Sequence, residues 1–422
     1  MTIRFENTDS IDFSGLIRPG DTVLIGQADS EPAPLSRVLA ARRASIGGRF
    51  RVFLGVNLCD AFEPAHADCI DFLAYCGTGR NRPLAKAGVL DILPCHYSEF
   101  PGLIRSRRLP ADVVMLQVAP PDAQGRYSLG IAHEFMTTAI DHARVVIVEV
   151  NDQCPWTYGE RYLTDDDIDV VVHTSRPALE SPAVVPGELD RTIARHVASL
   201  IEDGATLQFG LGALPEAILG ELAGHRDLGV HSGTIGDKVA ELMEKGVITN
   251  ARKSVDAGLT VTGMMMGSRR VHAFSHLNPA VQFRGTDAIH GAAALAQHER
   301  FTALNSAIEV DLTGQIGAEV AGGTYLGAVG GALDFLRAAR TSKGGLPIVA
   351  LPSMAGASSR IVARLGGPVS TPRSDAGIIV TEHGIADLRG LPLRQRVARM
   401  IAIAHPEVRE ALAREVHGTL GI

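Results

Sequence analysis

Short runs of Val, Ile and Leu alternate with helical segments along the first half of the chain. A near-continuous apolar run is typical of a strand buried on both faces of a parallel sheet. The pattern predicts strands at Thr22–Gly26, Phe50–Leu54, Val113–Val118 and Val145–Val150, and helices at Pro34–Arg43 and Phe135–Ala143. This alternation indicates a parallel sheet with helices on both faces. Ligands bind at the loops that follow the strands of such sheets.

A proline-rich segment divides this pattern in two. Ser175–Glu188 lacks periodicity and is typical of a linker. A long helix beginning near Leu189 follows it, and the order of strand and helix then starts again. Further strands are predicted at Ala205–Phe209, Leu346–Leu351 and Gly377–Val380. We therefore expect the 422 residues to form two similar α/β domains with open, mostly parallel sheets, at residues 1–180 and 190–422.

Composition narrows the class of protein. Hydrophobic residues make up 45% and charged residues 21% of the chain, as in globular proteins. The longest apolar runs are strand-sized and the first residues show no signal-peptide pattern, so we expect a cytoplasmic protein that does not enter a membrane. A formal net charge of −7, without a long Lys/Arg run, argues against nucleic acid as a partner. The five cysteines show no Cys-x-x-Cys spacing and are expected to be reduced and buried.

Eight separated motifs in a fixed order connect the chain to a known family. They are Gly26–Pro32 (GQADSEP), Leu93–Glu99 (LPCHYSE), Ala119–Gly125 (APPDAQG), Glu149–Asp152 (EVND), Gln208–Pro215 (QFGLGALP), Gly327–Gly331 (GAVGG), Ser342–Gly345 (SKGG) and Val380–Leu388 (VTEHGIADL). Together they resemble the acetyl-CoA hydrolase/transferase family, which includes class I CoA-transferases of the 4-hydroxybutyrate and butyryl-CoA:acetate type. The resemblance covers nearly the whole chain.

A further segment, Gly229–Asp237 (GVHSGTIGD), resembles the active-site segment of this family. At the position of the family's catalytic glutamate, this sequence has Gly233. In the family that carboxylate attacks an acyl-CoA and then carries CoA as a glutamyl thioester, and glycine has no side chain for either step. The resemblance implies two CoA-transferase-like domains and a CoA-thioester substrate, with Gly233 marking a lost nucleophile.

The resemblance also implies an oxyanion hole. The backbone amides of Leu211 and Gly331 would polarise the thioester carbonyl, and Gly210, Gly212, Gly330 and Gly331 would bind the CoA thioester. The sequence Gly210-Leu211-Gly212 itself follows a strand and opens a helix, so its amides can face a ligand without hindrance from a Cβ atom. Tight turns that serve only the backbone are the alternative. Family members are often dimers or larger, so a homodimer or larger homo-oligomer is implied.

Other polar residues near these motifs are candidate pocket residues. We place Gln27, Glu31, His231 and Ser232 in the substrate pocket. Glu31 is also the nearest family-matched carboxylate and a candidate substitute for the lost acid, with a solvated loop acid or a helix N-terminal charge as the alternative. His231 and Ser232 are neighbours on a strand and point to opposite sides, which disfavours a hydrolytic pair. His231 is expected to pack in the core.

Several further residues are not assigned to chemistry. Asp237 and Glu241 match other positions of the family and are not expected to replace the nucleophile. His272 and His276 have a spacing that puts two rings on one helical face. No suitably placed glutamate, cysteine or further histidine completes a metal site, so we expect a packed or solvated pair and no metal. Ala332 stands where the family often has glutamine, which fits a changed acyl pocket.

Three functions fit a CoA-thioester pocket that lacks the glutamate. In the first, the pocket activates an acyl-CoA, and water or a second small molecule is the nucleophile, in a hydrolase, acyl transferase or cyclase. In the second, CoA moves between carboxylates with Glu31 or another acid as the substitute. In the third, the chain binds acyl-CoA without chemistry. The first is preferred because the oxyanion loops look intact. A sugar-phosphate or dinucleotide binder is disfavoured, since the first strand lacks a Gly-x-Gly-x-x-Gly pattern.

Overall fold

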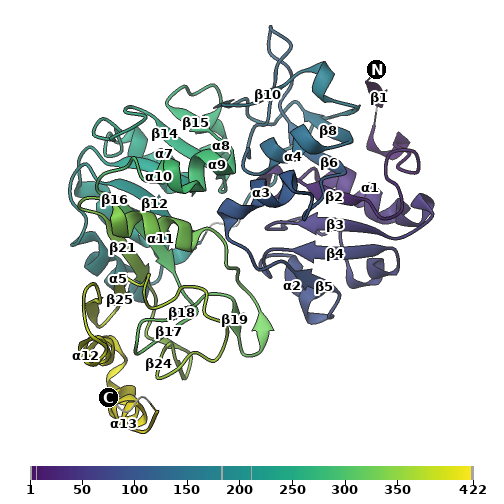
Figure 1. Ribbon diagram of the computed structural model, residues 1–422. Coiled ribbons are helices and arrows are strands. Elements are labelled where there is room, and N and C mark those ends of the chain that lie inside the picture. Colours follow the sequence, from purple (N-terminus) through teal and green to yellow (C-terminus); the bar gives the residue numbers. More distant parts are fainter. Residues whose placement is uncertain (1, 6, 182–183, 211, 420–422) are drawn as a thin grey trace. The chain divides into compact units, whose positions relative to one another are not determined.

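A computed structural model describes residues 2–5, 7–181, 184–210 and 212–419 of the chain (Figure 1). These residues form two compact units. Unit 1 comprises the described residues of Met1–Ala183, Ile235–Asp237 and Val261–Gly291, and unit 2 comprises those of Val184–Thr234, Lys238–Thr260 and Ala292–Ile422. Each unit is therefore assembled from stretches that are not consecutive in the sequence.

Unit 1 is built on an eight-stranded sheet in which all neighbouring strands are parallel. The strand order is β1-β11-β8-β6-β2-β3-β4-β5. The strands are β1 (Ile3–Phe5), β2 (Thr22–Ile25), β3 (Phe50–Leu54), β4 (Ile70–Ala74), β5 (Leu90–Ile92), β6 (Val113–Val118), β8 (Val145–Asn151) and β11 (Val170–Thr174). The two strands β6 and β8 are buried along their whole length, as expected for a parallel sheet covered on both faces.

Helices and short strands complete unit 1. The helices are α1 (Ala33–Arg42), α2 (Asn81–Lys86), α3 (Phe100–Arg105), α4 (Met136–His142), α8 (Arg269–Ser275) and α9 (Thr286–His290). The short strands are β7 (Tyr127–Ser128), β9 (Tyr158–Gly159), β10 (Tyr162–Leu163), β14 (Thr260–Met265, its first residue in unit 2) and β15 (Val281–Phe283). β7 pairs with β10, and β9 pairs with β15, so the segment that carries α8 and α9 is tied to unit 1 by backbone hydrogen bonds.

An aromatic cluster fills part of the core of unit 1. The rings of Phe53, Phe100 and Phe135 have centroids 4.9 to 5.9 Å apart, and all three side chains are fully buried. Tyr97 packs edge-on against Phe100 at 5.2 Å and against Tyr75 at 5.5 Å. A buried tyrosine usually finds a hydrogen-bond partner for its hydroxyl. The hydroxyl groups of Tyr75 and Tyr97 are therefore polar groups within an otherwise apolar cluster.

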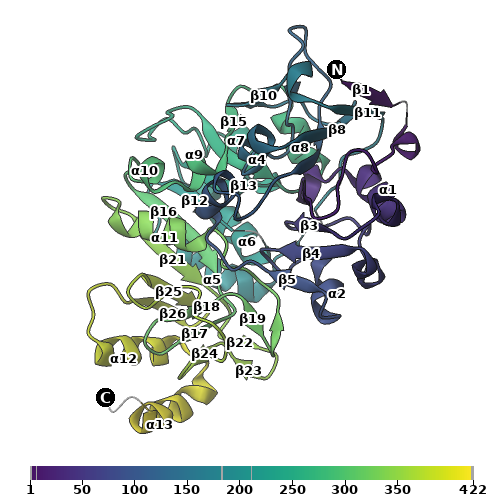
Figure 2. The same cartoon turned by 45° about the vertical axis from the view of Figure 1, so that its right-hand side comes forward.

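The main sheet of unit 2 has the strand order β26-β25-β21-β16-β12-β13 within this unit. Its strands are β12 (Thr206–Phe209), β13 (Gly229–Ile235, its last residue in unit 1), β16 (Phe301–Ser306), β21 (Leu346–Ala350), β25 (Ile378–Thr381) and β26 (Gly384–Asp387). Neighbours are parallel except β25 and β26. Helix α11 (Ala332–Thr341) packs on β16 and β21, while α5 (Glu188–Ala198) packs on α6 (Ala213–Glu221) (Figure 2).

The other elements of unit 2 are short or peripheral. The helices are α7 (Asp237–Glu244, its first residue in unit 1), α10 (Ala292–Leu295), α12 (Leu393–Ile403) and α13 (Arg409–Thr419). The strands are β17 (Glu309–Asp311), β18 (Ile316–Gly317), β19 (Val320–Ala321), β20 (Thr324–Tyr325), β22 (Met354–Ala355), β23 (Ser358–Ser359) and β24 (Ile361–Val362). Three of them, β17, β18 and β24, form a separate small sheet.

The predicted fold class is confirmed, since the chain is α/β with large, mostly parallel sheets. Every strand and helix predicted from the apolar runs occurs, with ends that agree to within one residue. In the predicted linker Ser175–Glu188, the described residues up to Gly187 contain no helix or strand, and Glu188 already belongs to α5. The domain boundaries at 1–180 and 190–422 stay a prediction. Among the described residues, no helix combines the length and the apolar character that crossing a bilayer requires.

Candidate functional site

Gln27 lies in the loop after β2, and all hydrogen-bonding positions of its side chain are used. Its Nε2 donates to the hydroxyl of Tyr97 at 2.7 Å and to Oε2 of Glu134 at 2.6 Å. Its Oε1 accepts from the backbone N–H of Val56 and from the hydroxyl of Tyr75, both at 2.8 Å. A side-chain amide has two donor hydrogens and two acceptor lone pairs. The amide of Gln27 therefore holds the loop in place, and its role in a substrate pocket stays a prediction.

Glu134, which precedes α4, is the buried carboxyl group of this network. Its φ of 44° lies in the left-handed region, where a residue other than glycine costs about 1–3 kcal/mol and often marks a functional site. Burial raises the pKa of Glu134 to about 7, although the hydrogen bonds from Gln27 and Tyr97 act in the opposite direction. A carboxyl group that titrates near neutrality can both donate and accept a proton.

Glu31 lies at the other end of the same loop, and it is buried. Its Oε1 accepts a hydrogen bond from the backbone N–H of Leu58, and its Oε2 accepts one from the N–H of Cys59 at 3.0 Å. Both amides belong to the loop after β3, outside any helix. The solvated acid and the helix N-terminal charge are therefore both excluded. Burial raises the pKa of Glu31 to about 8, so at neutral pH this group is mainly protonated.

Gly233 lies near the carboxyl end of β13 in unit 2. β13 runs parallel to β12, with Thr206 opposite Gly229 and Leu207 opposite Val230. Gly233 is half-buried, and its backbone is that of a strand, without the positive φ that favours glycine. A residue with a side chain can adopt this conformation. Backbone geometry therefore does not require glycine here.

The two residues before Gly233 make separate contacts inside unit 2. The hydroxyl of Ser232 lies 3.4 Å from the N–H and 3.3 Å from the carbonyl oxygen of Phe209, so it joins β13 to the end of β12. The ring of His231 lies 4.4 Å from that of His298 and packs against Phe301 at 6.4 Å. His231 is therefore a packed core histidine, as expected. Its role and that of Ser232 in a substrate pocket stay proposals.

The two glycine loops of unit 2 lead into helices. Gly212 has φ of 121° and is the N-cap of α6, and Gly331 is the N-cap of α11, preceded by Gly330 with φ of 59°. The first amides of a helix have no partner inside it, so they are available to an oxyanion. Both helices pack against β16. Leu211 lies outside the described residues, so its assignment as an oxyanion donor stays a prediction.

A pair of amide side chains lies beside Gly210. Asn305 Nδ2 donates to Gln208 Oε1 at 3.0 Å, and Gln208 Nε2 donates back to Asn305 Oδ1 at 3.4 Å. The N–H of Gly210 itself donates to the carbonyl of Leu304 at 3.0 Å as part of the sheet. The N–H of Gly210 is thus already hydrogen-bonded. Because glycine has no side chain, there is room for another group on the side of Gly210 that faces Asn305. A Cβ atom on Gly210 would lie 4.0 Å from Asn305 Oδ1.

The two acids that follow Gly233, Asp237 and Glu241, both have structural partners. Asp237 accepts hydrogen bonds from the N–H groups of Ser268 and Val271, each at 3.0 Å. Glu241 binds two lysines, Lys238 and Lys245, whose hydrogen bonds lower its pKa to about 2. Neither acid is free to replace a nucleophile at Gly233.

Of the predicted packed or solvated pair, His272 is buried in α8 and His276 is exposed directly after Ser275, where α8 ends. His272 Nε2 lies 3.1 Å from Asp29 Oδ2, and His276 Nδ1 accepts a hydrogen bond from the N–H of Trp156 at 3.0 Å. The two rings therefore serve different partners. Within the described ranges, no group of three or more His, Cys, Asp or Glu residues is arranged to hold a metal ion.

Two features of the site were missed from the sequence. Glu134 and its neighbour His133 form a polar pair inside an otherwise apolar run, and this interruption could have been noticed. Asp29 lies inside the motif Gly26–Pro32, but its partner His272 is distant in the sequence and nothing in the local pattern connects them. The network around Gln27 depends on loops that only the fold brings together.

The arrangement within each unit suits a different part of acyl chemistry. Unit 1 buries two carboxyl groups, Glu31 and Glu134, whose pKa values lie near neutrality. Groups of this kind are suited to moving protons in a reaction. Unit 2 presents the starts of α6 and α11, each behind a glycine loop, and the strand that carries Gly233 pairs with β12, which leads into α6. Helix starts of this kind stabilise a developing negative charge on oxygen.

Comparison with known proteins gives the family. The model of the acetyl-CoA hydrolase/transferase N-terminal domain matches residues 8–186, and that of the C-terminal domain matches residues 267–416. A 4-hydroxybutyrate coenzyme A transferase of Clostridium kluyveri is 40% identical over 341 residues, covering 80% of this chain and 80% of that protein. A butyryl-CoA:acetate CoA-transferase of Anaerostipes caccae is 31% identical over 419 residues, covering 95% and 93%.

Solved structures agree with these sequence matches. The crystal structure of RipA from Yersinia pestis superimposes with a TM-score of 0.94 at 31% identity, covering 100% of this chain and 98% of that one. The resemblance inferred from the separated motifs is thus confirmed. Both halves of the chain match the family's models, and relatives match over nearly its whole length. The chain therefore belongs to the acetyl-CoA hydrolase/transferase family.

Proposed function

We propose that this protein is an acyl-CoA-dependent enzyme that transfers the acyl group directly to water or to a second small-molecule nucleophile, without a covalent enzyme–CoA intermediate. The observation that carries the proposal is Gly233. Its place in β13 corresponds, by the resemblance of Gly229–Asp237, to the family's catalytic glutamate. The backbone there is that of a strand without a positive φ, so its conformation does not itself demand glycine, which supports a change in chemistry as the reason for the missing carboxylate.

The proposed reaction consumes an acyl-CoA and a nucleophile that carries a hydrogen. The nucleophile attacks the thioester carbonyl, the carbon–sulfur bond breaks, and the products are the acylated nucleophile (or the free acid) and CoA as a thiol. The amides of Leu211 and Gly331 are the proposed oxyanion donors, each contributing about 2.7–4 kcal/mol if they act as such donors usually do. Glu31 and Glu134 are candidates for moving the proton, since their pKa values of about 8 and about 7 lie close to neutrality.

A second candidate function is transfer of CoA between carboxylates, with a substitute acid as the nucleophile. The names of the relatives favour it, because two of them are CoA-transferases. Glu31 is a poor substitute, since its two oxygens already accept backbone hydrogen bonds and its raised pKa keeps it mainly protonated. A homologue that binds acyl-CoA without chemistry is the third candidate. We also propose a cytoplasmic homodimer or larger homo-oligomer, by analogy with the family.

The test is to incubate the purified protein with short acyl-CoAs, with and without acetate, and to follow free CoA and the exchange of CoA onto acetate. The proposal predicts release of CoA that does not depend on acetate, and no acetyl-CoA. Adding candidate amines and alcohols should raise the rate and yield an acylated product. Formation of acetyl-CoA would contradict the proposal and establish a carboxylate-based transferase. Binding of acyl-CoA without release under any of these conditions would establish the non-catalytic alternative.

A further inference from the structure

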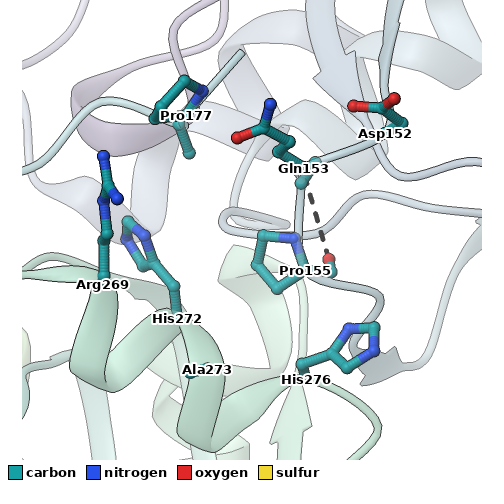
Figure 3. Close-up of a pocket in the computed structure, with 10 residues that line it drawn as sticks. Asp152, Gln153, Pro155, Pro177, Arg269, His272, Ala273 and His276 are labelled. Atoms are coloured by element: carbon teal, nitrogen blue, oxygen red, sulfur yellow. Dashed lines mark hydrogen bonds between the residues drawn. The ribbon is translucent and has the colours of Figure 1, made fainter. Parts of the chain in front are cut away.

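A cavity of about 350 Å³ lies in unit 1, and no residue of the hydrogen-bond network around Gln27 lines it (Figure 3). It lies between α8 on one side and two short segments, residues 152–155 and 177–178, on the other. Its walls are largely apolar, from Pro155, Pro177, Ala178 and Ala273. Pockets of this size hold small organic molecules, with a few polar groups that fix their orientation.

His272 is the buried polar group of this cavity. It lines the wall, is only 7% exposed, and points its Nε2 at Asp29 Oδ2, 3.1 Å away. Asp29 is fully buried and also accepts hydrogen bonds from the hydroxyl of Ser181 at 2.6 Å and from the N–H of Gly267 at 2.9 Å. With the carboxylate oxygen of Asp29 as the acceptor, Nε2 of His272 carries the hydrogen of this bond.

In the neutral imidazole the other ring nitrogen of His272, Nδ1, is an acceptor. Nδ1 makes no hydrogen bond within the described part of the chain, and the ring lines the cavity. The partner on Nε2 fixes the tautomer and the orientation of the ring. A ligand in this cavity therefore meets a fixed nitrogen lone pair that needs an N–H or O–H donor.

Arg269 supplies the complementary group one turn away on α8. Residues three apart on a helix are neighbours on its surface, and Figure 3 shows the side chains of Arg269 and His272 extending side by side from α8. The Nε of Arg269 donates to Glu180 Oε1 at 3.0 Å, which holds the guanidinium in place. Its two Nη groups make no hydrogen bond within the described residues, so they are open to an anion.

We propose that this cavity binds a small α-amino acid. Such a molecule carries an ammonium group and a carboxylate on one carbon. These groups match the acceptor Nδ1 of His272 and the two Nη donors of Arg269. The carboxylate pairs with the Nη groups of Arg269, since arginine binds carboxylates in a planar, bidentate manner. The ammonium group donates to Nδ1 of His272, and Asp152 adds a second acceptor in the lining. The proline and alanine walls select an apolar side chain.

The chain contains its own reporter for this binding. Trp156 is the only tryptophan in the sequence. Its backbone N–H donates to Nδ1 of His276, and both its neighbour Pro155 and His276 line the cavity. A ligand that enters the cavity should therefore change the fluorescence of Trp156. This readout does not depend on any reaction with acyl-CoA, so it is separate from the test of the proposed function.

The experiment titrates the full chain with L-leucine, N-acetyl-L-leucine and L-leucinamide, followed by Trp156 fluorescence and by calorimetry. N-acetylation removes the ammonium group and amidation removes the carboxylate. We expect saturable binding of L-leucine, and affinity at least about tenfold weaker for each derivative, as for the loss of one charged hydrogen bond. Equal binding of either derivative would overturn the proposal, as would the absence of binding by L-leucine, L-valine and L-alanine.

Variants locate the ligand. Arg269→Gln should weaken L-leucine about tenfold or more while leaving L-leucinamide unchanged. Arg270→Gln is the matched control, because Arg270 is an exposed neighbour on α8 that does not line the cavity, and it should bind as the unaltered protein does. His272→Gln removes the proposed acceptor of the ammonium group, but it also removes the partner of the buried Asp29 and could prevent folding. The decisive variant is therefore Arg269→Gln. Unchanged L-leucine affinity in Arg269→Gln would overturn the proposal.

Discussion

The side-chain amide of Gln27 donates a hydrogen bond of 2.6 Å to the buried carboxyl group of Glu134. This bond connects the loop after β2 to the residues that precede α4. The same amide is held by two tyrosine hydroxyls from the aromatic cluster. The loop that carries both Gln27 and Glu31 is therefore held in place within unit 1, beside the buried carboxyl group of Glu134.

The raised pKa values of Glu134 and Glu31 predict that stability falls as the pH rises. Both groups have pKa values near 4.5 when unfolded, and about 7 and about 8 when folded. Between the unfolded and the folded pKa values, the folded state binds more protons than the unfolded state. The free energy of unfolding therefore falls as the pH rises through the folded pKa values. The stabilisation is complete below the unfolded pKa. For Glu134 it amounts to about 3 kcal/mol, measurable by urea denaturation at about pH 5 and about pH 8.

Glu134→Gln should remove part of this pH dependence. Glutamine is neutral at every pH and has the shape of the protonated acid, so the variant should lose less stability than the unaltered protein between acidic and alkaline conditions. Glu407→Gln is the control, because Glu407 is a solvent-exposed acid whose side chain is 85% exposed. If Glu134→Gln showed the same loss of stability with pH as Glu407→Gln, the assignment of Glu134 as a main titrating group would be wrong.

Glu31→Gln should destabilise the fold in mildly acidic solution, where the Glu31 carboxyl group of the unaltered protein is protonated. Both oxygens of Glu31 accept backbone hydrogen bonds, from Leu58 and Cys59, whereas glutamine offers one oxygen and an NH2 group. One of the two amides then loses its acceptor, at a cost of about 1–3 kcal/mol. Urea denaturation of the variant would show this cost as a lower midpoint. An unchanged midpoint would contradict the claim that both oxygens of Glu31 accept buried hydrogen bonds.

The ion pair of Arg176 and Glu149 should stabilise the start of the linker. Two nitrogens of Arg176 bind the two oxygens of Glu149 at 2.7 and 2.9 Å, and the Glu149 side chain is fully buried. Arg176→Met would leave this carboxylate without its partner, at a cost of about 3–5 kcal/mol. The double change with Glu149→Met should regain much of the loss, because no buried charge remains. A double variant as unstable as the single one would contradict this account.

Gly55 is a position where a Cβ atom is not tolerated. A Cβ built on Gly55 would lie 2.1 Å from Oε1 of Gln27, so Gly55→Ala should displace this side chain and disrupt its hydrogen bonds. A loss of several kcal/mol is expected for such overpacking together with broken buried hydrogen bonds. Gly102→Ala is the control. Gly102 lies in α3 with nothing within 4 Å of an added Cβ, so alanine should stabilise by about 0.5–1 kcal/mol. Thermal denaturation compares the two.

The strands could be predicted because their apolar runs are a local property. The runs at β6 and β8 are buried along their length, as the absence of polar positions indicates. The partners of Glu31 could not be predicted, because they are backbone amides of the loop after β3, and backbone amides leave no trace in the sequence. The same holds for Asp29 and His272, which only the assembly of unit 1 from separate stretches brings together.

His276 lies just outside α8, although its spacing from His272 suits one helix, and the reason is local. The spacing suits a helix, but the chain leaves the helix at Ser275, where an extended residue follows. Helix ends are less well determined by periodicity than helix centres. The glycine at position 233, in contrast, could be assessed from the sequence alone, since the absence of a side chain needs no structure to be recognised.

The central claim, that no residue of this enzyme carries CoA covalently, is tested most directly by intact-protein mass spectrometry after mixing with acyl-CoA. The unaltered protein should keep its own mass throughout turnover. Gly233→Glu should acquire a CoA adduct that borohydride reduces or hydroxylamine releases, because the strand backbone accepts a side chain there. A CoA adduct on the unaltered protein would contradict the account, and peptide mapping of that adduct would identify the substitute acid.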